Sequence, residues 1–208
     1  MRSVAVAVLS LAILGVLGGA IFIYSGLYNV AATDPHWNLT YWVLEKARVR
    51  SIKAHAAGIT APAGYDDQAQ VERAVGHFAA HCAECHGTPG SKRGAVSQGM
   101  YPQPPDLTNV SKRFSPAEIF WILKNGIKMS GMSSMADDGD DMLWATVGFL
   151  QKLPTLSDDD YNDLWMASQA QGGGPGNMMD MGGMSMSHGP DGQRSPHAKS
   201  PTPRDRDQ

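Results

Sequence analysis

Two cysteines separated by two residues and followed at once by a histidine constrain this chain more than any other feature. The stretch HCAECHG, residues 81–87, contains both cysteines of the 208-residue chain. On a helix, Cys82, Cys85 and His86 lie on one side, because residues three and four apart are neighbours. C-x-x-C-H is the attachment pattern of c-type haem, in which the two thiols become thioethers and the imidazole reaches the iron. The sequence therefore predicts one covalently bound haem c, tethered by Cys82 and Cys85 and ligated by His86.

Three other uses of the cysteines remain as alternatives. A structural zinc ion needs four ligands, and only His81 and His86 could complete the set. A thioredoxin-like redox pair is expected at the start of a helix in a βαβ unit, whereas this pair follows a helical pattern. A simple disulfide would leave His86 and the glycine-containing loop after it without a role.

The iron of such a haem needs a sixth ligand, and residues 125–135, NGIKMSGMSSM, offer three methionines. A methionine ligand raises the reduction potential, which suits an electron carrier. Met132 is the preferred ligand, with Met135 and then Met129 as alternatives; core filling is the alternative role for any of them. The imidazole of His86 should donate its other N–H to a carbonyl, and Pro105 is placed to supply it.

The rest of the sequence predicts an all-α domain with long loops. Apolar spacing indicates a helix over residues 68–83, and the capping box of Ser115 and Glu118 begins another that ends at Gly126. Further helices are expected over residues 39–57 and 138–153, with a short last one capped by Ser157. Residues 87–112 read as a long irregular loop, and residues 169–208 as a disordered tail rich in Gly, Pro, Ser and Met.

Residues 4–24 contain no charge and are long enough, at about 1.5 Å per residue, to cross the ~30 Å core of a bilayer. A cleaved signal sequence is the alternative, but its apolar core usually spans about 7 to 15 residues, and here the apolar run continues past the small residues at 18–20. With Arg2 as the basic flank, we expect a single-pass anchor in the inner (cytoplasmic) membrane and a haem domain facing the periplasm.

Charge excludes one class of partner. Residues 66–168 contain 14 acidic and 8 basic side chains, a net charge of −6, so no basic face for nucleic acid is expected. Residues 39–57 are instead basic, with a net charge of +3. This helix could lie against anionic lipid head groups, remain solvated or dock on the acidic domain. The expected organisation is an anchor (1–25), a connector with the basic helix (26–66), a haem domain (67–168) and the tail (169–208).

Together, HCAECHG, PPDL at residues 104–107 and GIKMSGM at residues 126–132 resemble membrane-anchored, single-haem c-type cytochromes of the class I fold, as found in bacterial respiratory chains. The resemblance extends over residues 24–165 and includes GLYNVAATDPHW at residues 26–37. In that family the sixth ligand is a methionine that usually precedes proline, a position that maps onto Met132, although Ser133 follows it here. The resemblance implies a one-electron carrier between redox proteins at the membrane, with no catalytic residue and no small-molecule substrate.

Two alternative functions remain. The tail segment at residues 177–189 is rich in thioethers, which bind Cu(I), so the chain could instead be a copper-binding or copper-handling protein with a haem domain. The candidate copper ligands are Met178, Met179, Met181, Met184, Met186 and His188. The chain could also be a fixed cytochrome subunit of a larger dehydrogenase or oxidase.

Overall fold

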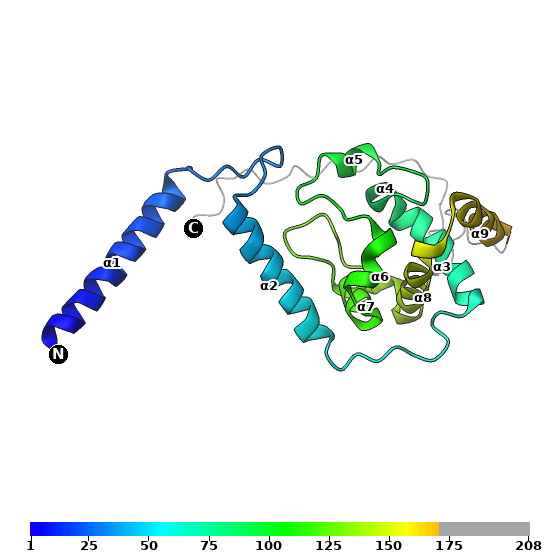
Figure 1. The fold of residues 1–208 in the computed structure, drawn as a ribbon, viewed down its shortest axis with the longest axis horizontal. Helices are drawn as coiled ribbons and strands as arrows, with labels where there is room; N and C mark the ends of the chain where they lie inside the picture. The colour runs from blue at the N-terminus through cyan, green and yellow to red at the C-terminus, as the bar shows by residue number, and fades with distance from the viewer. Residues whose placement is uncertain (171–208) are drawn as a thin grey trace, which may run out of the picture.

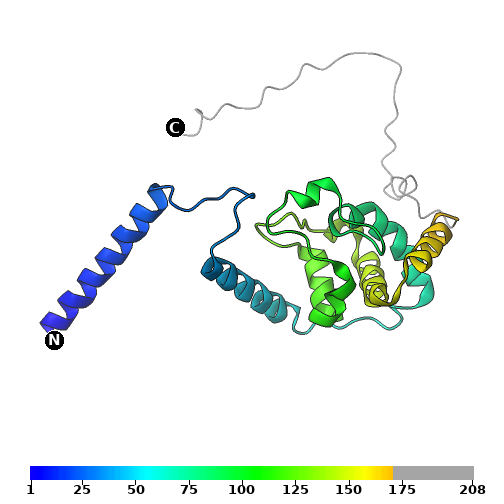
Figure 2. The same ribbon diagram turned by 45° about the horizontal axis from the view of Figure 1, so that its top comes forward.

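The computed structural model describes residues 1–170, and this part of the chain is helical, with a single isolated β-bridge between Thr88 and Ser91. An extended N-terminal region leads into a compact helical domain (Figures 1 and 2). The longer helices are α1 (Arg2–Tyr24), α2 (Asn38–Ala56), α3 (Gln68–His81), α7 (Pro116–Asn125), α8 (Asp140–Lys152) and α9 (Asp158–Ala170). The short ones are α4 (Ala83–His86), α5 (Ala95–Gln98), η1 (Leu107–Asn109), α6 (Val110–Arg113), η2 (Ala136–Asp138) and η3 (Leu153–Thr155). The all-α prediction is confirmed.

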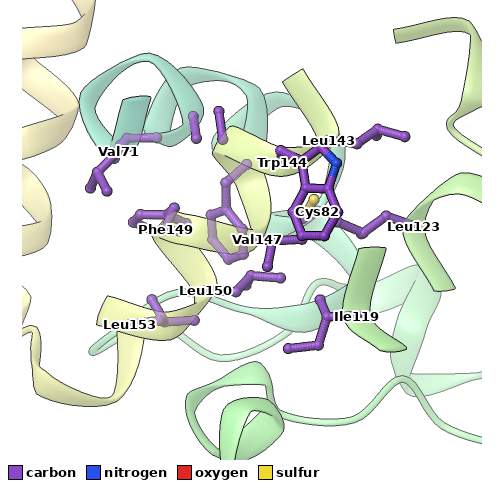
Figure 3. Packing of buried hydrophobic residues seen from close by; sticks show 14 of the residues in the cluster. Val71, Cys82, Ile119, Leu123, Leu143, Trp144, Val147, Phe149, Leu150 and Leu153 are labelled. Atoms are coloured by element: carbon purple, nitrogen blue, oxygen red, sulfur yellow. The ribbon is translucent and has the colours of Figure 1, made fainter. Parts of the chain in front are cut away.

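The core lies where α3, α7, α8 and α9 meet. Phe78 of α3 contacts Phe149 of α8 with ring centroids 5.0 Å apart and Tyr161 of α9 at 6.3 Å. Phe120 of α7 stacks on Trp144 of α8 at 4.3 Å. Figure 3 shows Phe149 and Trp144 within one buried cluster that also contains Cys82. The cysteine motif is therefore built onto the packed centre of the domain rather than onto a mobile loop.

The predicted helix boundaries hold where the sequence has a strong local signal. Ser115 accepts a hydrogen bond from the Glu118 backbone N–H, and Glu118 accepts one from the Ser115 backbone, so the capping box is formed. Ser157 and Asp160 make the same reciprocal pair at the start of α9. In α8, the regularly spaced Leu143, Val147 and Leu150 are buried, and so are the residues between them.

Three predictions of local structure need correction. Residues 87–112 are not one irregular loop, because α5, η1 and α6 interrupt it; Asp106 caps η1 by accepting from the Thr108 N–H. The helix over residues 68–83 breaks at Cys82, where α4 begins. The last helix runs to Ala170, two residues into the predicted tail, because residues 166–170 include Met, Ala and Gln, which favour helix.

The connector is less separate from the domain than its sequence indicates. Helix α2 packs on α7, and two of its residues, Ile52 and Ala56, are buried. Glu45 of α2 pairs with Arg113, 68 residues away along the chain. The other long N-terminal helix, α1, buries none of its residues. It is long and apolar enough to cross a membrane, a criterion that an N-terminal signal sequence also meets.

Candidate haem site

The cysteine motif sits on a turn that is held by its own backbone. The N–H groups of Cys85 and His86 both donate to the Cys82 carbonyl, at 3.1 and 2.9 Å. Gly87 then turns the chain at φ 77°, and a Cβ there would lie 2.8 Å from the Ser91 carbonyl oxygen. A residue with a side chain is therefore strained at position 87. The glycine lets the chain fold back tightly behind His86.

Cys82 is buried and Cys85 partly buried, and the two thiols do not form a disulfide. Burial raises the pKa of the Cys82 thiol to about 12, and the charge of Asp138 adds to the effect. A redox-active cysteine of the thioredoxin type needs the opposite shift, toward a thiolate at neutral pH. The environment of Cys82 therefore does not fit that alternative.

The imidazole of His86 is oriented by a loop that is distant in sequence. Its Nδ1 lies 2.7 Å from the carbonyl oxygen of Pro105, which is the contact predicted from the sequence. Burial lowers the pKa of this histidine, which favours the neutral ring that a metal requires. With Nδ1 donating to Pro105, Nε2 is the nitrogen left for an iron atom.

The loop of residues 101–107, which contains Pro105, is held in place by contacts with other parts of the chain. The guanidinium of Arg93 donates to the carbonyl of Pro104, next to the acceptor of His86. Leu107 packs against the hydrophobic core. Tyr101, at the other end of the loop, accepts a hydrogen bond from the backbone N–H of His36 at 3.1 Å.

The connector histidines His36 and His55 lie outside the predicted haem domain, which predicts exposed side chains for both, and that last contact shows that His36 departs from this expectation. Its ring is partly buried, with Nδ1 2.7 Å from the Tyr28 hydroxyl and an edge contact to Tyr101 at 4.9 Å. His55 is exposed, as expected, and lies against Trp121 at 5.6 Å. The connector thus reaches the loop that orients His86.

The methionine loop between α7 and η2 is closed by backbone hydrogen bonds. The N–H of Ile127 donates to the Met132 carbonyl at 2.9 Å, and that of Met135 donates to the Leu123 carbonyl at 3.0 Å. Gly126 begins the loop at φ 66°, where a Cβ would lie 2.6 Å from the Met132 oxygen. Position 126 requires glycine, because the positive φ is unfavourable for other residues and the Met132 oxygen leaves no room for a Cβ.

The three candidate methionines differ in environment. Met132 and Met135 are partly buried and pack against the core. Met129 is 91% exposed and has a positive φ of 59°. The structure therefore brings Met132 and Met135, but not Met129, into the interior. The tail residues Met178, Met179, Met181, Met184, Met186 and His188 lie outside the described residues.

The environments of two residues near the site go beyond what the sequence indicates: Met100 was not expected there, and His77 was expected to be only a surface or packing histidine. The Sδ of Met100 lies so close to Gly131 that a Cβ there would be 2.9 Å away, so a fourth thioether touches the methionine loop. His77 is 2% exposed, and its Nε2 lies 3.5 Å from a carboxylate oxygen of Asp138. Desolvation by burial lowers the pKa of His77 despite that carboxylate. Only the i+4 spacing of His77 and His81 hinted at the pair, whose rings lie 4.8 Å apart.

This donor set fits haem better than a bare metal ion. Within residues 1–170, no three His, Cys, Asp or Glu side chains are placed to hold a metal ion, so the ligand set of a structural zinc is not assembled there. Haem iron needs only two axial protein ligands, since the porphyrin supplies the others. A carbonyl-oriented imidazole, two unpaired thiols and partly buried thioethers meet that requirement.

An all-helical fold with a C-x-x-C-H turn and a carbonyl-bound imidazole defines a class of protein, the c-type cytochromes. A family comparison confirms this class: residues 69–150 match the family described as cytochrome C oxidase, cbb3-type, subunit III. The matched stretch runs from α3 to α8 and includes the whole site. Residues 69–150 therefore form a c-type cytochrome domain, a kind of domain that binds haem c and acts in electron transfer. Neither the curated proteins nor the solved structures include a significant match.

Proposed function

We propose that this protein is a membrane-anchored cytochrome that carries single electrons between redox proteins on the periplasmic side of the inner membrane. The observation that supports it most is the 2.7 Å contact between His86 Nδ1 and the Pro105 carbonyl, which leaves Nε2 as the metal-binding nitrogen. In this proposal Cys82 and Cys85 hold one haem covalently, and His86 and Met132 are its axial ligands. Residues 1–25 anchor the chain in the membrane, residues 26–66 connect this anchor to the next part, and residues 67–168 form the haem domain.

Haem c, when bound, supplies exchange of one electron between the ferric and ferrous states of its iron. The chain's own contribution is to keep the ligands still during that exchange. Pro105 holds the imidazole of His86, and the bond from Arg93 to Pro104 holds the loop behind it. On the other side, hydrogen bonds at both peptide groups of Met132 fix the methionine loop. A site that rearranges little between oxidation states transfers electrons without conformational delay, and the domain needs no catalytic residue for this role.

Purification of the full chain from membranes in mild detergent tests this function. We expect the protein to stay in the membrane after an alkaline wash, to elute without a stoichiometric partner, and to titrate reversibly as a single one-electron centre. Release by the alkaline wash contradicts the anchor. A second electron per chain contradicts the one-haem carrier.

The same purification distinguishes the shuttle from a fixed subunit. The matched family is described as a subunit of an oxidase, and this description supports the fixed-subunit alternative. A partner that elutes with the chain in constant proportion would establish that alternative instead of the shuttle.

Copper binding by the tail is a second candidate function, and the composition of residues 177–189 favours it. Thioether groups are soft ligands that prefer Cu(I). We expect a full-length variant with the tail methionines replaced by leucine and His188→Ala to lose most Cu(I) binding in a competition titration with a chromophoric chelator. Equal binding by the variant and the natural chain would show that the tail is not a copper site. The replaced methionines are Met178, Met179, Met181, Met184 and Met186.

A further inference from the structure

The first half of α2 exposes large apolar side chains outside the proposed membrane span. Leu39 is 72% exposed and Trp42 58% exposed, and Trp37, at the start of the helix, is also open to solvent. Tyr41, Val43 and Leu44 are exposed as well. Contiguous exposed apolar residues on a soluble domain usually mark a surface that something covers.

Basic residues continue the same face along the second half of the helix. Leu39, Val43, Lys46, Arg50 and Lys53 are spaced so that they share one side of α2. All five are exposed, whereas Ile52 and Ala56 on the other side are buried. We call Leu39, Trp42, Val43, Lys46, Arg50 and Lys53 the outer face of α2.

Within residues 1–170, none of the three basic side chains of the outer face has an acidic partner. Glu45, the acidic residue of α2, pairs with Arg48 of the same helix and Arg113 of the haem domain. The positive charge of Lys46, Arg50 and Lys53 is therefore free for an anionic surface outside the chain.

The position of α2 indicates which surface this is. In both views α2 lies between α1 and the rest of the domain (Figures 1 and 2). Aromatic contacts connect the end of α1 with the start of α2: the Phe22 ring lies 6.2 Å from Trp37 and 6.4 Å from Tyr28. The start of α2 is therefore held next to the end of α1, where a membrane spanned by α1 would have its surface.

We propose that the outer face of α2 binds the anionic lipid surface of the membrane that α1 spans. Leu39, Trp42 and Val43 enter the head-group region, where tryptophan and aliphatic side chains are favoured, and the lysines and arginine meet the lipid phosphates. The inference depends on the membrane anchor of the proposed function. It adds a second attachment, and because α2 is packed on α7, this attachment holds the haem domain in one orientation above the bilayer.

The full-length haem protein in lipid nanodiscs tests the proposal. The probe is quenching of Trp42 fluorescence by brominated phosphatidylcholine, with the Trp42→Phe protein as the blank. We expect stronger quenching in discs that contain phosphatidylglycerol than in discs of phosphatidylcholine alone. In the phosphatidylglycerol discs, quenching should fall by about half at high salt, since salt screens the contact between basic side chains and lipid.

Charge reversal provides the decisive variant. The protein with Lys46→Glu, Arg50→Glu and Lys53→Glu should lose most of the dependence on phosphatidylglycerol. A matched control reverses three exposed lysines of the haem domain, Lys92, Lys112 and Lys128, and should quench like the natural chain. An unchanged haem spectrum in both variants shows that the fold is retained.

Quenching that is equal in the two lipids would overturn the proposal, and so would a phosphatidylglycerol dependence that survives charge reversal. Absence of Trp42 quenching in every disc would also overturn it. That result would assign the outer face to a protein partner or a second copy of the chain. Failure of the anchor itself gives a different result, because a chain without its span does not enter nanodiscs at all.

Discussion

The double variant Cys82→Ala/Cys85→Ala is expected to lose covalent haem completely. These are the only cysteines in the 208-residue sequence, so no other thiol can form a thioether. After denaturation and acid extraction, the natural chain should keep its haem absorbance on the polypeptide, and the variant should keep none. Haem staining of a denaturing gel measures this directly.

The single variants and a neighbouring control make the result specific. Cys82→Ala and Cys85→Ala should each retain one thioether at most, with a shifted spectrum in pyridine because one vinyl group stays unreacted. His81→Ala, one position before the motif and exposed, should stain like the natural chain. Covalent haem on the double variant would refute the assignment of the tethers.

The parts of the structure that could be predicted from the sequence are those that local chemistry determines. The capping box of Ser115 and Glu118 fixes the start of α7, because both hydrogen bonds join residues three apart. The apolar spacing of α8 identifies Leu143, Val147 and Leu150 as buried, although the residues between them are buried as well. The contact of His86 with Pro105 spans 19 residues, yet it could be predicted because ligated histidines nearly always donate to a carbonyl and the proline-rich loop offers one.

The parts that could not be predicted depend on contacts between distant residues. The docking of α2 uses Glu45 with Arg113, and the burial of His36 uses Tyr101, at separations of 68 and 65 residues. Nothing local to either histidine distinguishes His36, which is partly buried, from His55, which is exposed. The position of Met100 beside Gly131 is of the same kind, since it depends on where two loops meet.

The three methionines of the methionine loop show both kinds of feature: one that the sequence alone indicates and one that depends on folding. Their presence in one loop is a sequence feature, whereas their separation into exposed and buried positions is a result of folding. Met129 takes a positive φ at the tip of the loop, which turns it toward solvent. Met132 lies where the loop closes on Gly126, and Met135 lies where it rejoins α7 through Leu123. Among the three methionines of this loop, burial therefore favours Met132 and Met135 over Met129 as the proposed axial ligand.

Met132→Ala is expected to abolish the weak far-red absorption band that a sulfur ligand gives to ferric haem. It should also lower the reduction potential by roughly 0.2 V, within the ~0.8 V range over which axial ligands set haem potentials. The physical reason is that a thioether stabilises ferrous iron, and a water molecule or a stronger donor in its place does not. A spectroelectrochemical titration of the purified protein records the band and the potential in one experiment.

The other methionines provide matched controls for this substitution. Met129→Ala removes an exposed side chain and should leave both the band and the potential unchanged. Met135→Ala removes packing against the core and should lower the free energy of unfolding while the band persists. If the band instead survives in Met132→Ala and disappears in Met135→Ala, the ligand is Met135. In that case the loop presents its sulfur from the segment anchored to α7 rather than from the turn that closes on Gly126.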